Sequence, residues 1–413
     1  MSILKPFPGI RPSKALAEKV AAPPYDVLNS AEARVLAEGN AFSFLHINKP
    51  EIDLAADVDV HDDRVYEKGA ENLQRFLKEE IISQDDTENY YVYRQIMGEH
   101  QQTGLVAVAS VAEYENDLIK KHEFTRPEKE DDRVKHMDHL NTQVGPVFLT
   151  YQAEATINKL ISQCTAAVPE YDFTGEDGIR HVFWVVNNAD MIASIESAFQ
   201  KVPCLYVADG HHRSAAAMRI KQMCEKKNPS HSGNEAYNFF LVVVFPHDQM
   251  QILDYNRVVL DLNGLRPEGF LEKLADKFVV TKSAVACKPK ACHEFGMYLD
   301  GQWYSLTTRA DVVDENDPVA RLDVAILQDN ILSPLLAIGN PRTDQRIDFV
   351  GGIRGMQELE KRVDSGECAV AFACYPTSIE NLMAIADAGE VMPPKSTWFE
   401  PKLKTGLVIH GLD

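Results

Sequence analysis

The clearest pattern along the chain is an alternation of apolar runs with amphipathic runs between residues 181 and 245. HVFWVV (181–186), CLYVA (204–208) and FFLVVVF (239–245) are short, apolar and rich in β-branched or aromatic residues, which predicts three strands. The intervening runs ADMIASIESAFQKV and SAAAMRIKQMCEKK have the composition of helices. We therefore expect a strand-helix-strand-helix-strand unit of α/β type, with residues 209–214 at the joint between its second strand and second helix.

Similar patterns extend the prediction to the rest of the chain. Residues 90–124 alternate apolar and polar positions, which predicts antiparallel strands, including one through TGLVAVASVAEYEN. Further on, HEFGMYLDGQWYSLTT predicts a hairpin turning at Asp300-Gly301, and IDFVGG and CAVAFACYP predict strands that alternate with helices. The expected fold class is α/β (α+β), with mixed sheets and helices. The turn cluster DLNGLRPEG divides the chain into an N-terminal α/β domain over 1–260 and a C-terminal α/β domain over 261–413.

Composition and charge narrow the class of protein. The chain has 413 residues, 45% apolar and 25% charged, which is typical of a globular protein with more than one core. Its formal net charge of −20 does not favour a nucleic-acid-binding surface, because phosphate contacts need clustered Lys and Arg. No apolar run has the length of a membrane span, and the start lacks the apolar core of a signal peptide. The seven cysteines have scattered spacing, so we expect a cytoplasmic protein whose thiols are all free.

The segment LYVADGHHRSAAAMRI (205–220) concentrates the most reactive side chains. Asp209 and Gly210 end the predicted strand, and Arg213 and Ser214 open the predicted helix, whose free N–H groups and dipole would form an anion site. Gly210 lets a phosphate approach the backbone, and Arg213 can clamp two of its oxygens. Asp209 can hold a metal ion or accept a proton from a hydroxyl group.

Other interpretations of this segment stay open at the level of sequence. His211 and His212 can add a hydrogen-bond donor or move a proton, or they can be surface polar groups beside an Asp209 that merely caps the helix. A histidine metal site is a third interpretation, although neighbouring histidines diverge and no third ligand is evident. Four such groups within five residues, at one strand–helix joint, favour chemistry over capping.

Two further positions follow a predicted strand. His122 and Glu123 precede a helix start, and because successive strand residues face opposite sides, at most one of them is expected to face a site. The run EKEDDRVKHMD that follows is interpreted as a solvated helix face. CHEFG (292–296) resembles a metal-binding motif only superficially, and the chain has no nucleotide-binding glycine loop of the GxGxxG or GxxxxGK[ST] type.

Two proline-stiffened loops carry polar groups that such loops often present to ligands. APPYDV (22–27) is expected to offer Tyr25 and Asp26 to a substrate. MPPKSTWFEPKL (392–403) is expected to offer Lys395, Ser396 and Thr397 to phosphate. We predict that both loops border the same pocket as Asp209.

The motif ADGHHRSAAA resembles that of the ParB/sulfiredoxin superfamily, in which a Gly-x-x-Arg turn binds nucleotide phosphate, and its DGHHR form is most similar to the free-serine kinases. The segments VAAPPYDV, HEFT, ADGHHR, NPRTD and MPPKSTWFEPKL also resemble, over nearly the whole chain, the prokaryotic family catalogued as domain of unknown function 1015. The resemblance implies a ParB/sulfiredoxin-like strand-helix core in which residues 210–213 hold phosphates and Asp209 lies at the reacting centre. It also implies a catalytic glutamate upstream of the turn, for which Glu123 is the first candidate and Glu176 the second.

These observations predict a cytoplasmic phosphotransferase that acts on a small hydroxylated metabolite, with free serine or O-phosphoserine as first candidate. Mg²⁺ and a donor such as ATP, ADP or pyrophosphate are the expected cofactors, and neither a membrane nor a nucleic acid is an expected partner. Two alternatives stay open: a phosphoserine phosphatase-type hydrolase, and a nucleotide-switched ParB-like binding protein without turnover. The candidate residues are Asp209, His211, His212 and Glu123 for catalysis, Gly210, Arg213, Ser214, Lys395, Ser396 and Thr397 for phosphate or nucleotide, and Tyr25, Asp26 and His122 for substrate.

Overall fold

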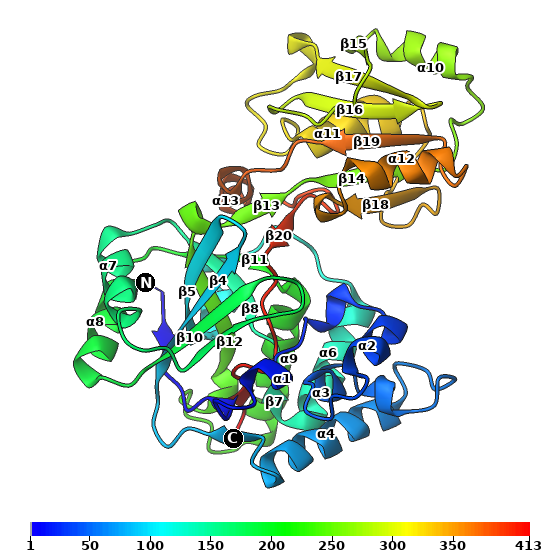
Figure 1. The fold of residues 1–413 in the computed structure, drawn as a ribbon. Helices are drawn as coiled ribbons and strands as arrows, with labels where there is room; N and C mark the ends of the chain where they lie inside the picture. Colours follow the sequence, from blue (N-terminus) through cyan, green and yellow to red (C-terminus); the bar gives the residue numbers. More distant parts are fainter. Residues whose placement is uncertain (1) are drawn as a thin grey trace. The chain divides into compact units, whose positions relative to one another are not determined.

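The computed structural model describes residues 2–413, which form two compact units (Figure 1). Unit 1 comprises residues 2–250 and 401–413, and unit 2 comprises residues 251–400. The chain therefore leaves unit 1 once and returns to it, whereas the sequence analysis placed a single boundary near residue 260. The turn cluster near residue 260 lies inside unit 2, because β14 (Tyr255–Val259) before it already pairs with β18 (Ile347–Gly351) and β19 (Val370–Cys374).

Unit 1 is built on a nine-stranded mixed sheet in the order β6-β11-β8-β12-β5-β4-β10-β9, with β1 paired to β5 beside this path. The pairs β11–β6 and β12–β8 are parallel, and the other pairs of this sheet are antiparallel. The strands are β1 (Leu4–Lys5), β4 (Tyr90–Met97), β5 (His100–Ser110), β6 (Ile119–Lys120), β8 (Val147–Tyr151), β9 (Tyr171–Thr174), β10 (Arg180–Val186), β11 (Leu205–Asp209) and β12 (Phe239–Pro246).

The strand-helix order predicted for residues 181–245 is confirmed. It consists of β10, α8 (Ala189–Phe199), β11, α9 (His211–Lys227) and β12, and residues 209–214 lie at the β11–α9 joint. The three strands are not neighbours in the sheet, because β8 lies between β11 and β12, and β5 and β4 lie between β12 and β10. The fold class is thus α/β with mixed sheets, as predicted.

The strand predicted through VAEYEN is wrong. Strand β5 ends at Ser110, and Val111–Glu115 form the short helix α5. Val111 and Tyr114, three positions apart, are both buried, which is the spacing of a helical face and not of a strand.

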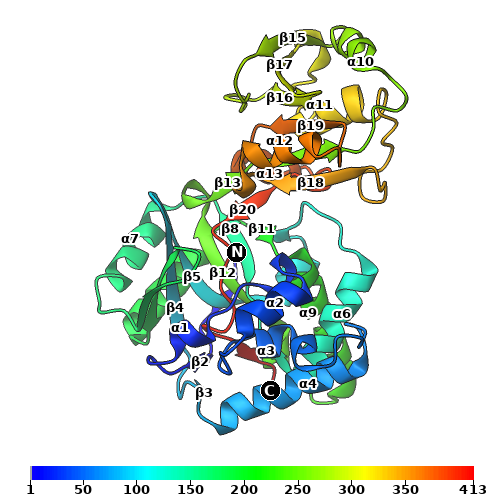
Figure 2. The ribbon, with the colours of Figure 1, turned by 45° about the vertical axis from the view of Figure 1, so that its right-hand side comes forward.

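Helices flank the sheet of unit 1 in two groups (Figures 1 and 2). The helix pair α7 (Ala155–Cys164) and α8 supplies Ile157, Ile195 and Phe199 to the same apolar core as Leu105 and Val244 of the sheet. The second group consists of α1 (Ala17–Val20), α2 (Ser30–Ala37), α3 (Leu45–Asn48), α4 (Asp63–Lys78), α6 (Pro127–Leu140) and α9. Two short strand pairs complete unit 1, β2 (Ile10–Pro12) with β3 (Ile82–Gln84) and β7 (Thr142–Gln143) with β21 (His410–Gly411).

Unit 2 contains a six-stranded antiparallel sheet in the order β15-β17-β16-β19-β14-β18. Its predicted hairpin is confirmed, since Asp300 and Gly301 connect β16 to β17 with φ values of +49° and +72°, as a tight two-residue turn requires. The remaining elements are β13 (Gln251–Leu253), α10 (Pro267–Leu274), β15 (Phe278–Ser283), β16 (Glu294–Leu299), β17 (Gln302–Thr308), α11 (Asp323–Leu327), α12 (Met356–Asp364), α13 (Ile379–Asp387) and β20 (Trp398–Glu400).

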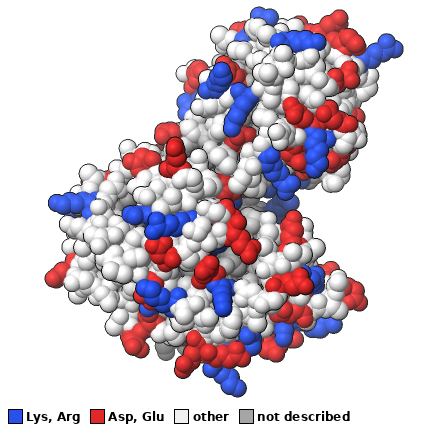
Figure 3. Space-filling view, viewed as in Figure 1, with Lys and Arg blue, Asp and Glu red and all other residues white. Residues whose placement is uncertain are grey.

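Three features of the whole chain bear on its class. All seven cysteines are free thiols, as predicted. Within residues 2–413, no helix has both the length and the apolar character needed to cross a bilayer. Acidic and basic side chains are interspersed on the surface shown in Figure 3.

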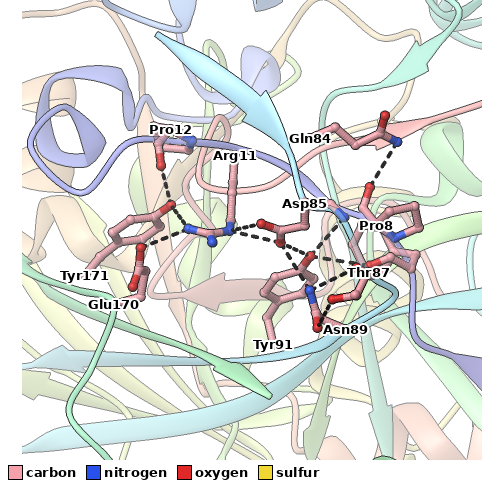
Figure 4. A network of polar contacts seen from close by, with 12 residues as sticks. Pro8, Arg11, Pro12, Gln84, Asp85, Thr87, Asn89, Tyr91, Glu170 and Tyr171 are labelled. Carbon is pink, nitrogen blue, oxygen red and sulfur yellow. Dashed lines mark hydrogen bonds and ion pairs between the residues drawn. The ribbon is translucent and has the colours of Figure 1, made fainter. Parts of the chain in front are cut away.

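A polar network ties the N-terminal strand β2 to the main sheet of unit 1 (Figure 4). The Nε of Arg11 donates to both carboxylate oxygens of Asp85 at 2.9 and 3.0 Å, and its Nη1 donates to Glu170 at 3.0 Å and to the Tyr171 hydroxyl at 3.1 Å. Tyr91 in turn donates its hydroxyl to Asp85 at 2.6 Å. Removing the guanidinium would leave two partly buried carboxylates without their cation.

Arg11→Met is therefore expected to lower the free energy of unfolding of unit 1 by about 2–4 kcal/mol, the cost of breaking a partly buried charged network from one side. Urea unfolding measures the change. The matched control is Arg180→Met, since Arg180 pairs with Asp172 at 2.7 Å on the surface and such exposed pairs contribute about 0–1 kcal/mol. Equal effects of the two substitutions would contradict the importance of this network.

Burial of histidines in unit 1 predicts acid sensitivity. Burial lowers the pKa of His410 to about 4, although its hydrogen bond to the Ala236 carbonyl opposes the shift. The unfolded state takes up a proton below about pH 6.5 and the folded state does not until about pH 4, so stability falls as the pH falls through this window. His122, His136 and His181 are buried and shifted in the same direction.

His410→Gln keeps a hydrogen-bond donor and removes the titrating ring. It is expected to make the loss of stability between pH 6.5 and pH 4 shallower, by up to about 1.4 kcal/mol per pH unit. Chemical unfolding at a series of pH values measures this slope, with His139→Gln on the exposed surface of α6 as the control. A slope unchanged from the parent protein would rule out the proton uptake assigned to His410.

Candidate functional site

The β11–α9 joint combines a left-handed glycine with a long helix. Gly210 is the N-cap of the 17-residue helix α9, with φ of +102°, and as a glycine it has no side chain of its own to cap the helix. A Cβ at this position would lie 3.2 Å from the Nε of Arg213, so glycine suits both the backbone and the packing. The first N–H groups of α9 and its dipole therefore give the joint a positive potential.

Arg213 is the buried cation of the joint. Its side chain is 7% exposed, and its guanidinium donates a hydrogen bond to the Pro146 carbonyl. Its Nη2 lies 3.5 Å from Asp26 and 3.7 Å from Asp209, while its Nε has no hydrogen-bond partner within residues 2–413. Burial acts to lower the pKa of Arg213, but the charges of Asp26 and Asp209 raise it above its ordinary value, so the group stays charged.

Asp209 lies between two cations. Its Oδ2 accepts from the Nζ of Lys402 at 3.3 Å and lies 3.7 Å from Arg213. Burial acts to raise the pKa of Asp209, but the charges of Lys402 and Arg213 outweigh it and lower the pKa below its ordinary value. Asp209 is therefore ionised at neutral pH, and the geometry pairs its carboxylate with these cations and not with the N-terminal amides of α9.

His122 and His211 form a buried pair beside the joint. Their rings meet edge to face with centroids 4.5 Å apart, and the Nδ1 of His211 lies 3.9 Å from the carboxylate of Glu123. Burial lowers the pKa of His122 to about 4 and that of His211 well below its ordinary value, so both rings are neutral. The Glu123 side chain is 45% exposed, and Glu176 is exposed in the turn between β9 and β10.

The other two predicted residues of α9 have defined partners. The Nε2 of His212 accepts a hydrogen bond from the backbone N–H of Arg126 at 3.1 Å, and burial lowers the pKa of this ring. The hydroxyl of Ser214 is buried and donates to the Gly210 carbonyl at 3.1 Å. The Ser214 hydroxyl thus stabilises the first turn of α9.

The loop at residues 22–27 brings Tyr25 and Asp26 to the joint. The guanidinium of Arg133 stacks on the Tyr25 ring at 3.9 Å from its centroid, and burial raises the pKa of Tyr25 to about 12. Ala22 exchanges two backbone hydrogen bonds with Thr405, whose hydroxyl also donates to the Ala22 carbonyl. The returning segment 401–413 therefore holds this loop in place.

Lys402 and Arg133 are site residues that the sequence analysis did not single out. Lys402 is part of the proline-stiffened loop 392–403, but Lys395 was the lysine chosen there. Arg133 belongs to the run interpreted as a solvated helix face, and this interpretation is wrong for Asp132, Arg133 and His136, which are all buried. The guanidinium of Arg133 is held by Asp132 through hydrogen bonds of 2.9 and 2.6 Å.

Lys395, Ser396 and Thr397 belong to unit 2, and the recorded contacts of the first two lie within that unit. The Lys395 carbonyl accepts from Arg257 at 3.0 Å, and its Nζ lies 5.5 Å from the centroid of the Tyr255 ring. The buried Ser396 hydroxyl donates to the Pro393 carbonyl at 2.6 Å. Their predicted contact with phosphate stays a prediction.

The fold and this charged cluster define a mixed α/β protein whose candidate site is assembled around a strand–glycine–helix joint. The chain belongs to the family described as "Protein of unknown function (DUF1015)", whose model matches residues 4–325. The family resemblance noted in the sequence is thus confirmed. No curated protein matches the sequence significantly.

Several solved structures show a distant likeness to the chain. A mutant free serine kinase in complex with AMP is 15% identical, with 68% of this chain and 84% of that chain covered and a TM-score of 0.34. SbnI with a C-terminal truncation, from Staphylococcus aureus, is 13% identical, with 72% and 84% covered and a TM-score of 0.35. A conserved hypothetical protein from Pyrococcus furiosus is 13% identical, with 68% and 87% covered and a TM-score of 0.32.

Proposed function

We propose that unit 1 transfers a phosphoryl group between a nucleotide or pyrophosphate and the hydroxyl of a small metabolite, with free serine as the first acceptor to test. The observation that carries this proposal is the β11–α9 joint, where Arg213 and Lys402 lie beside one ionised carboxylate, Asp209, at the glycine N-cap of α9. Phosphoryl transfer requires positioning and charge stabilisation more than covalent chemistry from the protein.

The phosphate-binding part of the proposal follows from charge and shape. The first N–H groups of α9 attract an anion, and the left-handed backbone of Gly210 begins the helix directly beside the Arg213 side chain. Arg213 is buried and permanently charged, and its guanidinium is held by the Pro146 carbonyl, so it loses little freedom on binding. Lys402 supplies a second cation that can shift from Asp209 to a phosphate oxygen.

The proton-transfer part assigns different roles to the two acidic groups. Asp209 has a lowered pKa and is a weak base, which suits a group that orients Lys402 and Arg213 or coordinates a cation. Glu123 is half exposed and lies beside the neutral ring of His211. We therefore propose that Glu123 accepts the proton from the hydroxyl group of the acceptor. As the hydroxyl oxygen bonds to phosphorus, the bond to the donor breaks and its oxygen leaves with the shared electrons.

Mg²⁺ is compatible with this donor set. Within residues 2–413, no group of three or more His, Cys, Asp or Glu side chains could hold a metal ion by itself. Because Mg²⁺ is often held by one or two carboxylates together with substrate phosphates, Asp209 and Asp26 fit a phosphate-bound ion. Such an ion would neutralise charge on the transferring group.

The choice of serine and of a nucleotide follows from the similarity of DGHHR to the free-serine kinase motif. Phosphorus NMR tests it directly, with the purified chain, Mg²⁺, serine and either ATP, ADP or pyrophosphate. Formation of phosphoserine at the expense of the donor is the expected result. Free phosphate released from phosphoserine alone would identify a phosphatase, and nucleotide binding without either reaction would identify a nucleotide-switched binding protein.

A further inference from the structure

Two fully buried glutamines face each other across strands β4 and β5 of unit 1. Gln95 and Gln102 are both 0% exposed and are directly paired in the register of these strands, which are labelled in Figure 1. Glutamine is seldom fully buried, because an amide group removed from water without hydrogen bonds costs free energy. The Nε2 of Gln102 donates to the Oε1 of Gln95 at 3.0 Å, and the Nε2 of Gln95 donates to the main-chain carbonyl of Lys402 at 2.8 Å.

The chemistry of the last acceptor fixes the orientation of both amides. A carbonyl oxygen can only accept, so Gln95 must turn its NH2 group towards Lys402 and its oxygen towards Gln102. The Oε1 of Gln102 in turn lies 3.4 Å from the Nε2 of His100. Gln95 therefore has one hydrogen-bonding arrangement here, and that arrangement ties the main chain of Lys402, the lysine that contacts Asp209, to β4.

A second side chain of β4 holds the next part of the same segment. Tyr93 lies two positions before Gln95, and thus on the same face of the strand, and its hydroxyl forms a hydrogen bond with the backbone of Lys404. The Nζ of Lys404 lies 2.7 Å from the carboxylate of Asp177. Strand β4 therefore has two separate contacts with residues 402–404, one for each lysine.

We propose that Gln95 is a positioning residue for Lys402, because it holds the main chain at the point from which the ammonium group reaches Asp209 at 3.3 Å. Residues 402–404 belong to no helix or strand. A lysine side chain has a flexible four-carbon stem, so the main-chain hydrogen bond limits where its Nζ can lie. The consequence for ligands rests on the function proposed for unit 1, whereas the placement of Lys402 can be measured without a ligand.

Reductive methylation of the folded full chain, followed by mass spectrometry of its peptides, measures how accessible each lysine is. Gln95→Met removes the donor to Lys402 and is expected to raise the methylation rate of Lys402 about three- to tenfold, while that of Lys404 changes less. Asn72→Leu is the matched control, since Asn72 is also buried and donates to a main-chain carbonyl, that of His46, at 2.7 Å. An unchanged rate at Lys402, or an equal rise at Lys404 or in the control, overturns the proposal.

Gln95→Asn provides the same test if Gln95→Met does not fold. It keeps an amide group beside Gln102, but its side chain is one methylene shorter, so its NH2 group falls short of the Lys402 carbonyl. Faster methylation of Lys402 is again the expected result. A folded Gln95→Asn chain in which Lys402 reacts as in the parent protein contradicts the positioning role.

Calorimetric titration with pyrophosphate connects the placement of Lys402 to the proposed phosphate site. Gln95→Met and Lys402→Met are each expected to weaken binding about three- to tenfold, and the double variant should bind no more weakly than Lys402→Met, because Gln95 acts through Lys402. Additive losses in the double variant overturn this route of action. If the parent chain bound neither pyrophosphate nor ADP, the proposed function would fail, and the methylation rates would still decide whether Gln95 positions Lys402.

Discussion

Asp209→Asn is expected to reduce phosphoryl transfer by about 100- to 10,000-fold while nucleotide binding persists or improves. The substitution preserves the shape of the side chain but removes the negative charge that holds Lys402 at 3.3 Å and faces Arg213 at 3.7 Å. Lys402 and Arg213 then interact more strongly with the phosphate of the donor, so the affinity for the donor is not expected to fall. Turnover at saturating donor and acceptor, measured beside the donor dissociation constant, separates the two effects.

Asp131→Asn is the matched control for this substitution, because Asp131 also accepts from an arginine of α9, Arg219, but lies on the exposed surface. Turnover of the control should equal that of the parent. A similar result for Asp209→Asn would show that the carboxylate of ADGHHR serves the fold and not the reaction. If donor binding fell together with turnover, Asp209 would instead belong to the binding of the donor.

Arg213→Ala is expected to weaken binding of the phosphorylated ligand by about 10- to 150-fold, the equivalent of one charge-assisted hydrogen bond of about 1.5–3 kcal/mol. Arg213→Lys should restore part of this affinity only, because an ammonium group lacks the planar fork that can contact two oxygens at once. Calorimetric titration with the donor nucleotide measures both variants.

Because Arg213 is buried and donates to the Pro146 carbonyl, its replacement by alanine is also expected to lower the stability of the folded protein. Arg219→Ala on the same helix is the control, since Arg219 is partly exposed and pairs with Glu130 and Asp131. Thermal unfolding of all three variants identifies folded protein before titration. Unchanged nucleotide affinity in folded Arg213→Ala would remove Arg213 from the phosphate site.

Local sequence signals accounted for much of the fold. The elements from β10 to β12 and the turn at Asp300-Gly301 depend on interactions between residues close in the chain, so apolar runs and turn residues locate them. The sheet order depends on pairing between distant segments, and nothing in the run around β11 indicates that β8 is its antiparallel neighbour. The helix α5 was missed because Ala112 and Tyr114 alternate with two glutamates directly after β5, which resembles a strand although Val111 and Tyr114 have helical spacing.

The candidate site also has one part that local sequence signals predict and another that depends on residues far apart in the chain. The joint itself could be predicted, because strand, glycine, arginine and helix are contiguous in the sequence. Lys402 could not, since its ion pair with Asp209 spans 193 positions along the chain. The burial of Arg133 was not predicted, because Arg133 lies in a run of charged residues and such a run usually indicates a solvated helix face. In the structure, the Tyr25 ring covers its guanidinium.

The return of residues 401–413 to unit 1 has a consequence for biosynthesis. A ribosome makes the loop at 22–27 and the β11–α9 joint early, but it makes Lys402 and Thr405 only after the whole of unit 2. Until then Asp209 lacks its lysine and the loop lacks its backbone hydrogen bonds to Thr405. Because domains generally fold as units during synthesis, and residues 251–400 are all made before residue 401, unit 2 can fold while unit 1 is still unfinished. A nascent chain halted within unit 2 therefore lacks part of its first unit, and translation of residues 401–413 is the last step in building the site.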